Sequence, residues 1–176
     1  MSGRRTGALI GAIAGLVFIL IHAGSLPDQI ALAVRVLGVA GFVAVLWLAV
    51  LRQPSAPRPL MNSPRGPWRV YWTSVAVEVA LIPVGAIVLS RLDHPELVLP
   101  WVVLIVGAHF MPFAKAFGIP TFRVLAGCLI GLAIGGGVLA LTVSAAAGTV
   151  VAGVLSGVAL LAFAGYLGRS EAPVPS

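Results

Sequence analysis

The stretch FRVLAGCLIGLAIGGGVLALTV, residues 122–143, decides the fold of this chain, because one charge stands near its start, at Arg123, and none follows. A helix needs roughly 20 mostly apolar residues to cross a hydrocarbon core of about 30 Å. We therefore predict an all-α, polytopic transmembrane bundle of six helices. The other five predicted spans are approximately residues 8–23, 30–51, 68–90, 97–113 and 148–167.

The composition also indicates a bilayer as the surrounding solvent. The 176 residues are 60% hydrophobic and 9% charged, whereas soluble domains carry roughly 25% charged residues. The net charge of +6 reflects 11 basic residues against 5 acidic ones, so it does not indicate a nucleic-acid-binding surface. A single cysteine, Cys128, excludes an internal disulfide, and we expect it to be buried in packing. No Cys/His spacing predicts a metal site, and we expect no cofactor.

The positions of the basic residues predict the orientation of the spans. Short loops rich in Lys and Arg stay in the cytoplasm, so we predict a multi-pass protein of the plasma (inner) membrane with both termini cytoplasmic. Residues 1–176 then form a single membrane domain, with a proline-rich cytoplasmic loop at 52–67 and a short cytoplasmic tail at 168–176. The basic residues that fall on one side are Arg4, Arg5, Arg52, Arg58, Arg65, Arg69, Lys115, Arg123 and Arg169.

Residues 1–23 permit two interpretations. Two arginines, a short apolar stretch and small residues at its end are also typical of a cleaved signal peptide. Gly7, Gly11 and Gly15 recur every fourth residue, which builds a flat face for another helix, and a discarded peptide needs no such face. We therefore favour retention. Cleavage would leave five helices with unchanged orientations.

The same spacing of small residues recurs in the last two spans and predicts close helix contacts there. Helices in lipid associate through van der Waals contact, which small residues permit at short backbone separation. Packing within one bundle is the simpler explanation, and contact between copies is the alternative, so the oligomeric state stays open. The glycines are Gly127, Gly131 and Gly135 in the fifth span and Gly153 and Gly157 in the sixth.

Glu78 is an acidic residue whose charge costs free energy inside a membrane. It lies ten positions into the third span, which places it about 15 Å from the inner boundary, near the midplane. A charged side chain there costs roughly 2.5 to 3.5 kcal/mol on insertion scales, so it needs a partner or a purpose. Helical spacing places Tyr71 and Ser74 on the same stripe as Glu78. Pro83 frees a carbonyl and predicts a bend nearby.

His109, well within the fourth span, is the predicted partner of Glu78. The third and fourth spans are neighbours along the chain, so the imidazole and the carboxyl can meet. Phe110 and Phe113 place an apolar wall beside the imidazole. We predict Glu78 and His109 as catalytic residues and Tyr71, Ser74, Phe110 and Phe113 as substrate-binding residues, while a plain Glu–His bond that joins two helices is the structural alternative.

The stretch VGAHFMPFAKAFGIPTFRVLAG, residues 106–127, resembles a His-Phe-x-Pro pattern followed by a basic loop in small bacterial polytopic membrane proteins, most of them uncharacterised. The resemblance implies a shared fold with His109 and Pro112 as its signature, and it implies no established activity. The layout is loosely similar to that of small membrane-bound terpene cyclases, which bundle short helices around a protonating carboxyl.

These residues lead to three hypotheses. The first is a membrane enzyme acting on a lipophilic small molecule, with proton-initiated isoprenoid cyclisation as its reaction and Glu78 as general acid. The second is a carrier or proton-coupled exporter of a hydrophobic compound, in which Glu78 exchanges protons. The third is a non-catalytic accessory subunit, which needs no titrating site. In all three the bilayer is a partner, and no nucleic acid is expected.

Overall fold

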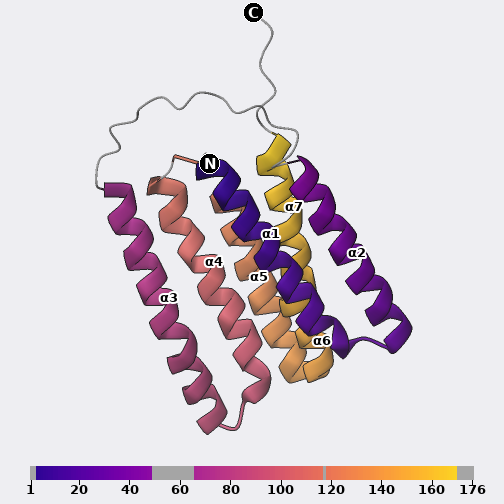
Figure 1. Ribbon diagram of the computed structural model, residues 1–176. Helices are drawn as coiled ribbons and strands as arrows, with labels where there is room; N and C mark the ends of the chain where they lie inside the picture. Colours follow the sequence, from indigo (N-terminus) through magenta and orange to yellow (C-terminus); the bar gives the residue numbers. More distant parts are fainter. Residues whose placement is uncertain (1–2, 49–65, 117, 170–176) are drawn as a thin grey trace, which may run out of the picture. The chain divides into compact units, whose positions relative to one another are not determined.

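The computed structural model describes residues 3–48, 66–116 and 118–169, and every regular element in these ranges is a helix (Figure 1). Five are long: α1 (Gly3–His22), α2 (Asp28–Leu46), α3 (Gly66–Arg91), α4 (Val98–Ala116) and α5 (Thr121–Thr142). The others are η1 (Ala23–Ser25), η3 (Pro95–Leu97), α6 (Ala145–Thr149), the π-helix η4 (Val150–Leu155) and α7 (Ser156–Arg169).

The described residues contain six helices that are long and apolar enough to cross a membrane, which confirms the predicted all-α fold. A helix suits this environment because all its backbone hydrogen bonds are made within the segment. The last span runs continuously through α6, η4 and α7. The six spans are Gly7–Ser25, Asp28–Leu46, Arg69–Arg91, Pro95–Ala116, Thr121–Thr142 and Ala145–Tyr166.

Local chemistry sets the turns between the helices. Asp93 and Gly118 adopt positive φ angles of 57° and 65°, which lets the chain reverse after α3 and after α4. Ser144 precedes α6, and its hydroxyl oxygen accepts a hydrogen bond of 3.1 Å from the backbone N–H of Ala147. This cap satisfies one of the donors that a helix start leaves unpaired.

The chain divides into two compact units, and the boundary falls inside the last span, between Ser156 and Gly157. Unit 1 comprises residues 1–61 and 157–176, and unit 2 comprises residues 62–156. Most of the proline-rich loop and of the tail, residues 49–65 and 170–176, lies outside the described residues. The single domain and the cytoplasmic termini stay predictions.

Unit 1 is held together by small side chains between α1, α2 and α7. A Cβ added to Gly157 would lie 2.6 Å from the carbonyl oxygen of Gly15, so only glycine permits this approach of two backbones. Gly38 similarly accommodates the side chain of Ile19. The predicted glycine face is thus confirmed at Gly15 and Gly157. The surrounding apolar core consists of Ala8, Ala12, Ile19, Val45, Leu161 and Ala164.

Unit 2 packs α3 against α4, α4 against α5, and α5 against α6 and η4. Its closest backbone approach joins Gly136 and Gly148, where a Cβ on Gly148 would lie 2.7 Å from the carbonyl oxygen of Gly136. The prediction of tight contacts along the glycine stripe of the fifth span was wrong for two members: Gly127 and Gly131 are exposed and have no atom near an added Cβ. The tight contact lies instead on another face of α5.

The same rotation of α5 overturns the expectation for Cys128. The thiol is exposed, not buried. Cys128 lies beside Gly127 on the face that carries Val124, which is 70% exposed. In a transmembrane helix, such a position faces the surroundings of the unit, where an apolar side chain is suited to lipid.

Candidate functional site

Helices α3 and α4 are joined near one end by Trp101. Its indole Nε1 donates a hydrogen bond of 2.9 Å to the carbonyl oxygen of Leu81. The ring occupies the space that a side chain at Gly85 would fill, and Gly85 is buried. Glycine at this position therefore lets the two helices approach closely. This contact was not predicted from the sequence.

Further along the same two helices, Glu78 on α3 meets His109 on α4. Nδ1 of His109 lies 2.7 Å from Oε2 of Glu78, a distance typical of a charge-assisted hydrogen bond. The N–H direction does not point at the oxygen, so the contact is not a directed hydrogen bond. The two groups are in electrostatic contact, and a rotation of either side chain would align them.

The side chains of Glu78 and His109 are partly buried. The side chain of Glu78 is 19% exposed and that of His109 is 17% exposed. From Arg69 onward, Gly85 is the one buried residue of α3. Helix α3 therefore covers the pair on one side, and the outer face of the helix is exposed. Part of each side chain is therefore accessible from the surroundings.

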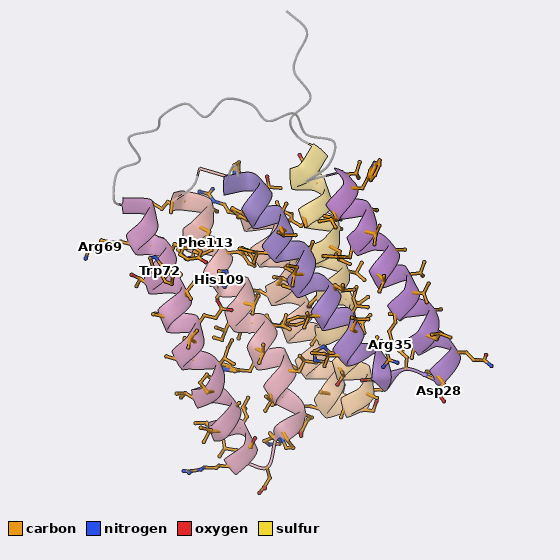
Figure 2. The ribbon with its side chains drawn as sticks, in the orientation of Figure 1. Asp28, Arg35, Arg69, Trp72, His109 and Phe113 are labelled. Carbon is orange, nitrogen blue, oxygen red and sulfur yellow. The ribbon has the colours of Figure 1, made fainter. Side chains whose placement is uncertain are left out.

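Aromatic rings surround the imidazole of His109. Its ring centroid lies 4.4 Å from that of Phe110, nearly parallel, and 4.8 Å from that of Phe113. Figure 2 shows His109 and Phe113 together on α4. The stack continues to Tyr71, whose ring lies 5.5 Å from Phe113. A wall of π faces thus flanks the Glu–His contact.

The structure brings together five of the six residues predicted for the site. Glu78 and His109 touch, His109 packs on Phe110 and Phe113, and Tyr71 stacks on Phe113. Ser74, the sixth, is half-buried one turn before Glu78 on α3.

Phe122, at the start of α5, was missed as a member of this group. Its ring stacks on that of Phe110 at a centroid distance of 5.7 Å. The signal was present in the sequence, because Phe122 follows the turn around Gly118 directly and α5 must fold back along α4.

The other histidine and carboxyl groups within the described part of the chain have local partners or lie at helix ends. Nδ1 of His22 donates a hydrogen bond of 2.8 Å to the carbonyl oxygen of Phe18. Nδ1 of His94 donates one of 2.9 Å to Oε1 of Glu96. The Arg35 guanidinium lies close to Gly24 at the end of the first span. Among the described residues, no group of three His, Cys, Asp or Glu side chains can hold a metal ion.

Unit 2 also contains an apolar hollow of about 190 Å³. It lies between α3, α4 and α5, and neither Glu78 nor His109 lines it. With no polar atom in its wall, it carries no chemistry of its own. Its lining residues are Leu89, Leu97, Pro100, Trp101, Leu104, Ala133 and Ile134.

No protein family, curated protein or solved structure matches this chain. The functional argument therefore starts from the Glu–His contact and the rings around it.

Proposed function

We propose that this chain is an integral membrane carrier that exchanges protons for a lipophilic small molecule, with Glu78 and His109 as its proton-binding pair. The observation that carries the proposal is the 2.7 Å approach of Nδ1 of His109 to Oε2 of Glu78 within two spanning helices. Ionisable groups inside a membrane are rare and commonly mark proton relays or substrate pathways. A pair that shares one proton can release it when another ligand reaches the carboxylate.

The imidazole favours a carrier over an acid that attacks a carbon–carbon double bond. The imidazole of His109 is a base within 2.7 Å of the Glu78 carboxyl. It can take a proton from Glu78 and return it, and this exchange competes with donation of the proton to an alkene. Partial exposure of both side chains suits a cargo that arrives from the bilayer.

The ring wall favours one second candidate, the membrane enzyme for proton-initiated isoprenoid cyclisation. The faces of Phe110, Phe113 and Tyr71 stabilise positive charge nearby, as a carbocation intermediate requires. In that case Glu78 protonates a polyene substrate, and His109 sets its protonation state. The accessory-subunit hypothesis needs neither the pair nor the rings.

Proton flux in reconstituted vesicles tests the carrier. The full chain is placed in liposomes that enclose a pH-sensitive dye, an outward proton gradient with an acidic interior is imposed, and neutral, cationic and anionic lipophilic compounds are added outside in turn, so that entry of a compound is coupled to exit of protons. We expect the wild type to dissipate the gradient with at least one compound, and Glu78→Gln to reduce that flux to the level of empty liposomes. Gln keeps the size and hydrogen-bonding capacity of Glu but cannot exchange a proton.

Glu96→Gln is the matched control, because Glu96 also contacts a histidine, His94, but at an exposed helix end. It should transport like the wild type. A Glu78→Gln protein with wild-type flux, or a wild type that responds to no compound, would refute the carrier. Turnover of a polyene by the wild type without proton flux would point to the enzyme instead.

A further inference from the structure

The surroundings of His109 resemble a binding site for an organic cation that is occupied by one of the protein's own side chains. The imidazole has a carboxylate oxygen at 2.7 Å and two phenyl rings at centroid distances of 4.4 and 4.8 Å. A cation within about 6 Å of an aromatic centroid is attracted by the ring quadrupole. When protonated, the imidazolium of His109 is itself the cation that these groups stabilise.

The charges of unit 2 make this arrangement selective for a positively charged ligand. Among its described residues, Glu78 is the one carboxyl away from the helix ends, and His109 is the one basic side chain there. Arg69, Arg91, Lys115 and Arg123 lie at helix ends and are exposed. An ionised Glu78 whose imidazole partner is neutral therefore has no other nearby counter-charge on its own helix pair.

We infer that the cargo of the proposed carrier is a lipophilic cation, which replaces His109 as the partner of the Glu78 carboxylate and packs on the rings of Phe110, Phe113 and Tyr71. This inference rests on the proposed function and names its substrate class. A neutral cargo would leave the carboxylate without a counter-charge in an apolar setting, and an anionic cargo would be repelled by it.

The rings and the access route exclude a small inorganic cation as the natural occupant. Na⁺ and divalent ions prefer several oxygen ligands, but the described part of the site offers one carboxylate and a set of aromatic faces. An organic cation with apolar substituents matches both features. It also partitions into the bilayer, and the exposed flank of the pair opens toward the surroundings of the helix bundle.

Binding of two probe ions of matched size and opposite charge tests the inference. The full chain in detergent is titrated with tetraphenylphosphonium and, separately, with tetraphenylborate. We expect the wild type to bind the phosphonium at least about tenfold more tightly than the borate, and Glu78→Gln to lower the phosphonium affinity by about tenfold or more. Equal binding of the two ions by the wild type would overturn the inference.

A ring substitution tests the π contribution separately and does not depend on the fate of Glu78. Phe113→Leu keeps an apolar side chain of similar volume but removes the ring, and we expect a loss of phosphonium affinity of about threefold or more. Phe42→Leu is the matched control, because Phe42 is a partly buried phenylalanine that packs in unit 1. Equal effects of the two substitutions would overturn the role of the ring wall.

The outcomes separate this inference from the proposed function. Glu78-dependent proton flux with a neutral compound, combined with no preference for the phosphonium ion, would overturn the cation inference and leave the carrier standing. Phosphonium binding that depends on Glu78, with no proton flux for any compound, would support the cation site and refute the carrier.

Discussion

Both units of this chain hold helices together through glycine contacts, but unit 2 adds polar contacts between α3 and α4. In unit 1, glycine and alanine bring backbones into contact, as at Gly15 and Gly157, and its core cluster is wholly apolar. In unit 2, α3 is joined to α4 by an indole bonded to a carbonyl and by the contact between Glu78 and His109. Polar groups are costly in a bilayer. The helices of unit 1 show that packing alone can hold helices together, whereas unit 2 retains polar groups that packing does not require.

The largest effect is expected from Gly157→Ala in unit 1. The added methyl group would lie 2.6 Å from the carbonyl oxygen of Gly15 and 3.0 Å from the backbone nitrogen of Ile19. Backbone atoms cannot move aside cheaply, so we expect the free energy of unfolding to fall by roughly 3 kcal/mol. Denaturant titration of the purified protein in mixed micelles measures the change.

Gly131→Ala is the control for that substitution. Gly131 has the same small-residue spacing along its helix, but no atom lies within 4 Å of an added Cβ. Its free energy of unfolding should not fall. If both substitutions destabilise the protein equally, glycine spacing matters more than the contact geometry described above. The proposed difference between the contacting Gly157 and the exposed Gly131 would then be wrong.

A smaller effect of opposite sign is expected from Ser156→Ala in unit 2. The side chain is fully buried, and its hydroxyl has no hydrogen-bond partner among the described residues. Removing an unsatisfied buried polar atom should raise the free energy of unfolding by about 1 kcal/mol. The same titration measures it, with Ser74→Ala at a half-buried position as the control. A loss of stability would mean that the hydroxyl has a partner, such as an ordered water.

The smallest effect is the coupling between Glu78 and His109. Interhelical polar contacts in membranes contribute about 0.6 kcal/mol on average and at most about 1.7 kcal/mol. A double-mutant cycle of Glu78→Gln and His109→Gln should give a coupling free energy in that range, too small to explain retention of a charged pair by stability alone. A coupling of about 4 kcal/mol would instead favour the structural interpretation of the pair.

Hydropathy and chain order predicted much of this structure. The number of spans follows from the length of each apolar stretch, because a bilayer leaves few ways to satisfy the backbone. The meeting of Glu78 with His109 was predictable because α3 and α4 are consecutive and both residues lie away from the helix ends. The role of the pair in proton exchange stays a prediction.

The rotation of each helix about its axis was not predictable in the same way. The glycine period in α5 is visible in the sequence, yet Gly127 and Gly131 are exposed while Gly136 makes the tight contact. The three consecutive glycines at 135–137 lie on different sides of the helix. The position of the neighbouring helix decides which of them makes the contact. The error for Cys128 has the same origin, and so has the omission of Phe122 from the ring cluster.

The contact between Gly15 and Gly157 has a consequence for biosynthesis. These residues are about 140 positions apart, and a ribosome adds roughly 5 to 20 residues per second. The first two helices therefore wait in the bilayer for many seconds before the segment that completes their unit is made. Unit 1 matures only after α7 has been made, so chains that stop before α7 should expose the glycine face of α1 to quality-control proteases.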